Sequence, residues 1–174
     1  ATTGAFSQAN SNGNAVRETV FFAKTGNPDW LTMRPGVHIT ATDLVRLHKT
    51  DLGLTDRDEL MLYRTDADAL GFVHYRYQQY HQGVPVDGAE LLVHEKDGYA
   101  RSLNGKLVRG LNVANVRPAL AAGTALNLAL QQVPAERYLW ELPEAEATLR
   151  RIKNDPAATF LPKPELVLAA PGFT

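Results

Sequence analysis

Two strand-like runs joined by a short glycine-containing loop, between Gly71 and His94, constrain the fold of this chain most strongly. Side chains of a strand point alternately to its two faces, so the first run has two different surfaces. Val73, Tyr75 and Tyr77 share one face, and the other carries Phe72, His74, Arg76 and Gln78. Because the second face mixes aromatic, basic and amide groups, we expect a sheet surface that is not simply open to water.

The strand pattern extends on both sides of these runs and predicts an antiparallel meander over residues 59–109. Strands are expected near 59–65, 71–80, 86–95 and 99–104. Asp97-Gly98 and Asn104-Gly105 are both dipeptides that favour tight hairpin turns. The second of them is expected to lead into a further strand at Lys106–Arg109.

Helical signals flank the meander. Thr40 to Asp43 is a typical helix start, and we expect a helix near 42–52 that ends at Gly53. An Ala- and Leu-rich helix near 119–133, a polar helix at 144–153 and a strand-like run at 165–170 follow. The predicted fold class is therefore α+β, with two packed units, each a helix against an antiparallel β-sheet, that meet near residues 110–118. Trp30 and Met33 are expected to form a hydrophobic plug in a loop.

The net charge and amino-acid composition of the chain exclude several classes of function. The formal net charge of -1 gives no basic face for nucleic acid. The chain has no cysteine, which excludes disulfides, thiol catalysis and iron–sulfur clusters. No apolar run approaches the roughly 20 residues that span a bilayer. The oligomeric state cannot be inferred from these totals.

Motifs for catalysis and metal binding fail on their spacing. His94-Glu95 resembles the start of a zinc peptidase motif, but Gly98 stands where the second histidine is required. His74 and His94 can meet across the hairpin, yet two imidazoles without a third ligand rarely form a zinc site. None of the serines lies in a G-x-S-x-G motif. We therefore predict no catalytic residues, no metal and no cofactor in this chain, and no enzymatic activity of the chain by itself.

The aromatic strand and the loop after it are the best candidates for a partner-binding or domain-ordering surface. Aromatic residues and arginine commonly anchor interfaces, and a proline within a strand favours a sheet edge where another chain can dock. The candidates are Tyr75, Arg76, Tyr77, Gln79, Tyr80, Pro85 and Val86. Arg76 and Gln79 fall on opposite faces, so we expect one to order the domain and the other to face a partner. The alternative is that both only brace the hairpin loop, and that the tyrosines cover a helix.

The same residues carry a family resemblance. The run R-Y-Q-Q-Y-H-Q-G-V-P-V from Arg76 to Val86 resembles the signature of the fungalysin/thermolysin propeptide (FTP) domain. L-G-L-T-D-R-D-E-L-M-L from Leu52 and S-L-N-G from Ser102 occur in the order expected of that family. The helix and strands that follow look like a PepSY domain. The resemblance implies a flexible arm at 1–29, an FTP-like domain at 30–110 and a PepSY-like domain at 111–174 that is incomplete at its C-terminal end.

In that family such a chain is the propeptide of a secreted thermolysin-like zinc metallopeptidase. The resemblance implies an intramolecular chaperone and inhibitor whose partner is the catalytic domain of its own precursor. It also implies zinc only in that catalytic domain, and a secreted or periplasmic location. The alternative is a free-standing extracytoplasmic FTP/PepSY binding module that regulates a peptidase or senses a ligand. A small-molecule carrier with a pocket between helix and sheet is a weaker third hypothesis.

Overall fold

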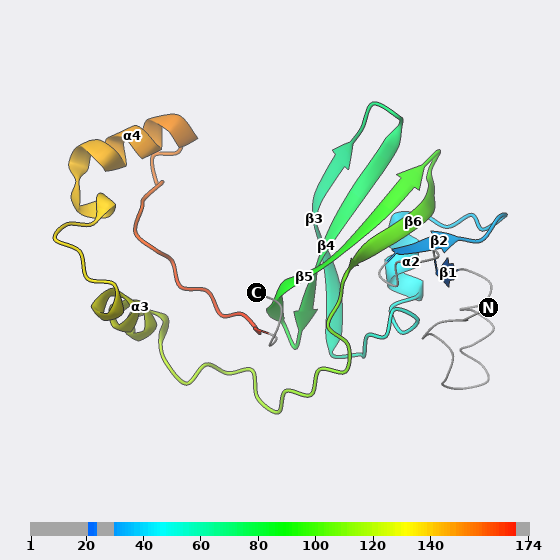
Figure 1. Cartoon of the computed structure of the whole chain (residues 1–174), viewed down its shortest axis with the longest axis horizontal. Coiled ribbons are helices and arrows are strands. Elements are labelled where there is room, and N and C mark those ends of the chain that lie inside the picture. The colour runs from blue at the N-terminus through cyan, green and yellow to red at the C-terminus, as the bar shows by residue number, and fades with distance from the viewer. Residues whose placement is uncertain (1–20, 24–29, 170–174) are drawn as a thin grey trace. The chain divides into compact units, whose positions relative to one another are not determined.

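The described residues before residue 117 form a six-stranded antiparallel sheet. The structure is a computed structural model that describes residues 21–23 and 30–169. The strand order is β1-β2-β6-β5-β4-β3, so β3 is one edge of the sheet (Figure 1). The strands are β1 (Phe21–Ala23), β2 (Trp30–Met33), β3 (Asp58–Ala67), β4 (Phe72–His81), β5 (Val84–Lys96) and β6 (Tyr99–Lys106). The antiparallel meander predicted from the sequence is confirmed.

Two tight turns set the register of the long strands. Gln82-Gly83 joins β4 to β5 with φ of 50° and 78°, and Asp97-Gly98 joins β5 to β6 with φ of 56° and 77°. Turns with positive φ at both central residues match the right-handed twist of the strands that they connect. Because the first turn takes only two residues, β5 begins at Val84 rather than near residue 86 as predicted.

The expected turn at Asn104-Gly105 is wrong, because both residues lie inside β6. Gly105 pairs with Leu91, and a Cβ at Gly105 would lie 2.2 Å from the Glu90 carbonyl oxygen. Glycine is therefore needed there for close approach of two backbones rather than for a reversal of the chain. No strand follows at 106–109 beyond Lys106, where β6 ends.

Helix α2 (Ala41–Leu47) covers one face of the sheet. Thr40 caps its first turn by accepting a hydrogen bond from the Asp43 N–H at 3.1 Å. The buried Glu95 carboxylate of β5 accepts the Ala41 N–H at 2.8 Å, which fixes the helix to the sheet. The core beneath α2 includes Leu31, Met33, Leu44, Val45, Leu52, Leu54, Leu91, Val93 and Leu103. The helix ends at Leu47 instead of residue 52, before the turns that lead to Gly53.

Trp30 and Met33 belong to β2 rather than to a loop, so that part of the prediction is wrong. Met33 is buried in the core as a plug would be, whereas Trp30 stacks on His94 with ring centroids 5.3 Å apart. The arm predicted at 1–29 lies outside the described residues, apart from residues 21–23, which form β1.

Residues 117–166 form a separate compact unit, whereas residues 167–174 group with residues 1–116. The separate unit contains α3 (Ala122–Gln132), a 3-10 turn at Leu139–Glu141 and α4 (Pro143–Lys153). The Tyr138 hydroxyl donates to the Val133 carbonyl at 2.9 Å, and the Glu146 carboxylate accepts the Phe160 N–H at 2.8 Å. None of the described residues of this unit forms a strand, so the second helix-on-sheet unit is not confirmed. Pro162 and Pro164 lack the N–H groups that a regular strand ladder would need.

No helix in the described part of the chain has the length and apolar character needed to cross a membrane.

Candidate partner-binding surface

The predicted surface residues divide between the two faces of the sheet. Tyr75, Tyr77 and Gln79 lie on the face that α2 covers, and Arg76 and Tyr80 lie on the opposite face, as alternation along β4 requires. Pro85 and Val86 lie at the start of β5. The seven candidates therefore do not form one continuous surface. The face that carries Arg76 is called the outer face below.

Gln79 orders the domain from within. Its side chain is fully buried, and its carboxamide makes two hydrogen bonds to the backbone of Val108. The amide nitrogen donates to the Val108 carbonyl at 2.8 Å, and the amide oxygen accepts the Val108 N–H at 2.9 Å. Because only a carboxamide provides donor and acceptor side by side in this way, Gln79 binds the segment after β6 to the middle of the sheet.

The two tyrosines on the helix-facing side are also structural. Tyr77 is 4% exposed and belongs to the core cluster. Burial raises the pKa of its phenol, and the Thr42 hydroxyl acts in the opposite direction. The hydroxyl has no hydrogen-bond partner of normal geometry among the described residues. The Tyr75 hydroxyl donates to Glu95 at 3.3 Å and so supports the carboxylate that binds the start of α2.

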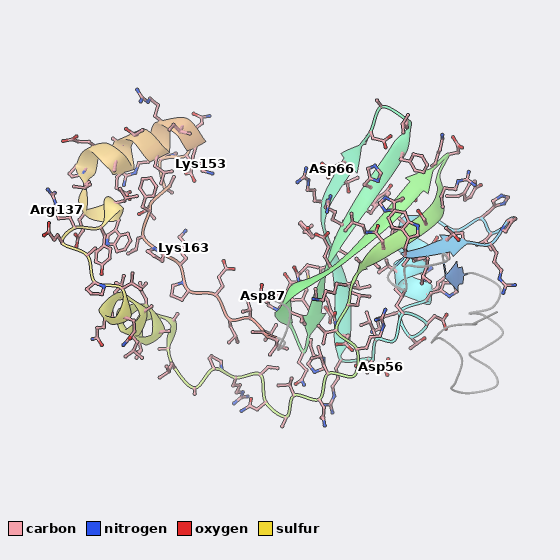
Figure 2. The ribbon with its side chains drawn as sticks, viewed as in Figure 1. Asp56, Asp66, Asp87, Arg137, Lys153 and Lys163 are labelled. Carbon is pink, nitrogen blue, oxygen red and sulfur yellow. The ribbon has the colours of Figure 1, made fainter. Side chains whose placement is uncertain are left out.

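Arg76 lies on the outer face in a small network of charges. Its guanidinium donates to the Glu90 carboxylate at 2.9 Å, and it lies 3.6 Å from Asp66 of β3, which is labelled in Figure 2. Glu90 also accepts a hydrogen bond from the Tyr63 hydroxyl, and this contact raises the pKa of Tyr63. The Arg76 side chain is half-buried and is held on the outer face by these neighbours.

Pro85 and Val86 do lie at a sheet edge, but Leu168 of the same chain already pairs with this edge. The Leu168 N–H donates to the Pro85 carbonyl at 2.9 Å, and the Asp87 N–H donates to the Leu168 carbonyl at 2.9 Å. These two bonds flank a parallel bridge between Val86 and Leu168, which we call the C-terminal bridge. Asp87, labelled in Figure 2, marks the end of β5 where it forms. The strand-like run at 165–170 is thus reduced to one bridging residue, and the edge is closed by the chain itself.

A polar row on the outer face joins three strands and the turn between β3 and β4. His74 and His94 approach each other with their Nδ1 atoms 2.7 Å apart, as expected from the hairpin. His74 Nε2 lies 3.1 Å from an Asp68 oxygen, and His94 Nε2 lies 2.6 Å from Asn104 Oδ1. The sequence prediction missed Asp68 and Asn104, because their places follow from the register of neighbouring strands. The described ranges contain no group of three or more His, Cys, Asp or Glu side chains arranged so that they could hold a metal ion.

A buried pair of Asp58 and His81 near the end of the β3–β4 ladder was also missed. His81 Nδ1 lies 2.7 Å from Asp58 Oδ1, and both side chains are almost completely buried. The Thr55 hydroxyl and N–H donate to the other Asp58 oxygen at 2.6 and 2.7 Å. Burial acts to raise the pKa of Asp58, but the Thr55 and His81 contacts outweigh it, and the pKa falls below its usual value. Nothing in the sequence alone distinguishes Asp58 from the exposed Asp56.

An open groove of about 470 Å³ lies between α2 and the edge strand β3. Its α2 side is formed by Thr42, Val45 and Arg46, together with Lys49 after the helix, and the β3 side by residues 58–62. Tyr77 forms part of the lining between them. The groove exists because α2 is short and leaves Leu62, which is 48% exposed, uncovered on the helix-facing side.

A known sequence motif matches the part of the chain that forms the four long strands β3 to β6. The Fungalysin/Thermolysin Propeptide Motif matches residues 58–107, which are β3 to β6 and the residue after them. The chain is 35% identical over 97 residues to the thermolysins of Alicyclobacillus acidocaldarius subsp. acidocaldarius and Bacillus caldolyticus, covering 55% of this chain and 18% of each relative. It is 41% identical over 61 residues to the thermostable neutral protease NprT of Geobacillus stearothermophilus, covering 35% and 11%.

Residues 58–107 thus carry a propeptide motif, and the chain is homologous to part of the thermolysins. The matched motif is a propeptide motif and not a catalytic one. The matched part spans less than a fifth of the length of these relatives. A PepSY-like domain over 111–174 stays a prediction.

Proposed function

We propose that this chain is the propeptide of a secreted thermolysin-like zinc metallopeptidase, and that it assists folding of the catalytic domain and inhibits it until cleavage. The observation that carries the proposal is the propeptide motif at residues 58–107, because it coincides with the four long strands of the sheet. Zinc is then bound by the catalytic domain, and the precursor reaches an extracytoplasmic compartment.

The outer face of the sheet supports a docking role. α2 covers the other face, and among the described residues of this unit no helix packs on the outer face. Arg76, Tyr80 and Phe72 all lie there, half-buried. Aromatic side chains and arginine are enriched among the residues that dominate binding energy at interfaces. In this proposal Arg76 contacts the partner, and Gln79, on the opposite face, keeps the sheet in the conformation that presents it.

A propeptide of this kind needs only modest intrinsic affinity. While both parts belong to one chain, a short flexible connection gives an effective concentration of roughly millimolar. A partner that binds the native catalytic domain stabilises it by mass action, and cleavage of the connection removes this effect. Inhibition and folding assistance then follow from the same contact, which the covalent connection strengthens and cleavage weakens.

The test is a titration of the cognate catalytic domain, with binding and peptide cleavage measured separately. Residues 1–174 are added to the catalytic domain at increasing concentration. We expect residues 1–174 to bind and the rate of peptide cleavage to fall as binding increases. Absence of binding would contradict the proposal and favour the free-standing binding module. Complete inhibition by residues 1–174 would show that the folded body itself covers the catalytic cleft.

A further inference from the structure

We propose that the exposed edge of β3 is a self-association surface, on which a second copy of this chain pairs antiparallel about a two-fold axis at Met61. The inference goes beyond the proposed function and does not depend on it. β3 pairs with β4 along one edge, and among the described residues no strand pairs with its other edge, called the free edge below. Met61, Leu62 and Tyr63 are 50%, 48% and 54% exposed, which places three consecutive large apolar side chains on that edge. Natural edge strands usually avoid such exposure because it promotes pairing with another chain.

The backbone of β3 offers its free hydrogen-bonding groups at defined positions. The Asp58 N–H donates to the Thr55 carbonyl, and the Asp58 carbonyl accepts from Lys49, so both groups point away from β4. Backbone groups of an antiparallel strand point alternately toward its two neighbours. Leu60 and Leu62 therefore present their N–H and carbonyl groups at the free edge, whereas Glu59 and Met61 direct theirs toward β4.

A two-fold axis at Met61 lets the free N–H and carbonyl groups of each copy pair with those of the other copy. It places Leu60 of one copy opposite Leu62 of the other, and both residues have their backbone groups at the free edge. Met61 then lies opposite Met61 in a pair without backbone hydrogen bonds, where side chains are closest. The two leucines forming each pair share the helix-facing side, since Leu60 and Leu62 lie opposite Gln79 and Tyr77 of β4. Backbone and side-chain requirements thus select the same register.

The groove beside β3 provides space for the leucines of the second copy. It is lined by Val45 of α2 and by Leu60, Leu62 and Tyr77, and it opens toward the same face as the paired leucines. Charges agree with the arrangement, because the antiparallel pairing brings the acidic Glu59 end of each strand toward the Arg64 end of the other. The irregularity of the ladder between Leu62 and Arg64 limits the regular pairing to a few residues, so we expect a weak dimer.

Sedimentation of the full chain over roughly 10 µM to 1 mM, a range in which weak interfaces associate, tests the proposal directly. We expect a monomer–dimer equilibrium that Leu62→Lys shifts to monomer. Leu139→Lys is the matched control, since Leu139 is 52% exposed on the separate unit. Circular dichroism and thermal unfolding verify that each variant is folded. A chain that stays monomeric over the whole range overturns the proposal, and leaves the edge to a different protein.

Disulfide trapping tests the register independently, because the chain has no cysteine of its own. Met61→Cys should form a covalent dimer about tenfold faster than Leu139→Cys, since paired strands raise the effective thiol concentration. Thr65→Cys, four residues further along the same edge, should resemble the Leu139→Cys control. Equal rates for Met61→Cys and Leu139→Cys contradict the pairing, and faster trapping of Thr65→Cys contradicts the axis at Met61.

Discussion

His74 and His94 face each other across β4 and β5, with their Nδ1 atoms 2.7 Å apart. Asn104 Oδ1 only accepts, so His94 Nε2 donates to it, and the Asp68 carboxylate likewise accepts from His74 Nε2. The two Nδ1 atoms at the centre of the row Asp68–His74–His94–Asn104 therefore share at most one proton. A proton on both would place two N–H groups against each other.

This arrangement predicts a loss of stability at mildly acidic pH. Burial lowers the pKa of His94, the Asn104 contact opposes this, and the charge of His74 lowers it further. Between the depressed folded pKa and the unfolded value near 6.5, the unfolded chain binds more protons. The free energy of unfolding should therefore be highest above about pH 6.5 and should fall as the pH decreases toward the folded pKa.

Urea unfolding at a series of pH values between about 7.5 and 5 measures this dependence. His94→Gln should show a smaller decrease than the unaltered chain, because it has no group to titrate at that position. His38→Gln, which replaces an exposed histidine whose ring is tilted against Tyr99, should retain the full decrease. The same slope in all three proteins would contradict the assignment to His94.

The buried pair of Asp58 and His81 should be among the most sensitive positions for stability. Asp58→Ala leaves His81 and both Thr55 donors without their partner, and breaking a buried pair in this way costs about 3–5 kcal/mol. Asp56→Ala, at an exposed position labelled in Figure 2, should change stability by less than about 0.5 kcal/mol. The free energy of unfolding from denaturant titration is the measurement. Similar values for the two variants would show that the pair is dispensable.

The same carboxylate gives a second, more acidic pH dependence. The folded pKa of Asp58 is lowered, so the stability it contributes is present above its unfolded value near 3.9 and is lost as the pH falls through the folded value. Asp58→Asn should remove this part of the acid dependence, which unfolding curves recorded below about pH 4 measure.

Arg76 and Gln79 should differ in what they affect. Gln79→Ala leaves both backbone groups of Val108 without partners and should cost about 1–3 kcal/mol. Arg76→Ala removes a half-exposed ion pair with Glu90 and should cost at most about 1 kcal/mol. In the precursor, Arg76→Ala should reduce the yield of active peptidase more than its stability loss explains. If yield follows stability in both variants, a partner-facing role for Arg76 is unnecessary.

The C-terminal bridge should be detectable by amide hydrogen exchange. The Asp87 N–H is protected only while its acceptor, the Leu168 carbonyl, is in place. Leu168→Pro removes the hydrogen bond to the Pro85 carbonyl and should accelerate exchange at Asp87. Leu166→Pro, two residues earlier at an exposed position, should have a smaller effect. Unchanged protection of Asp87 in Leu168→Pro would mean that the bridge does not form in solution.

Much of the sheet could be predicted from the sequence because local chemistry determines it. Alternation along β4 assigned its two faces correctly, and Asp97-Gly98 located one hairpin turn. Asn104-Gly105 has equally strong turn chemistry but lies within β6, where the approach of Glu90 requires glycine. Such a requirement depends on a neighbouring strand and has no signal in the dipeptide itself. The same limit explains why Asp68 and Asn104 were missed.

The sequence gives less information about where the candidate surface residues lie. Tyr77 and Gln79 were selected by residue type, but residue type does not show whether a side chain faces a partner or the Val108 backbone. The edge at Pro85 and Val86 was located correctly, and its occupant was not, because Leu168 is more than 80 residues away in sequence. Long-range pairing of a single residue leaves no periodic pattern.

The C-terminal bridge also has a mechanical consequence. Val86 and Leu168 are joined directly by the bridge. Tension between them therefore does not pass through the intervening chain, which includes the unit at 117–166. A force that pulls on the chain beyond Leu168 is transmitted to β5 through two hydrogen bonds and bypasses that intervening chain. Only after those bonds break does the intervening segment bear load. The bridge is therefore the contact that breaks first, and while it is intact it keeps small forces off the unit at 117–166.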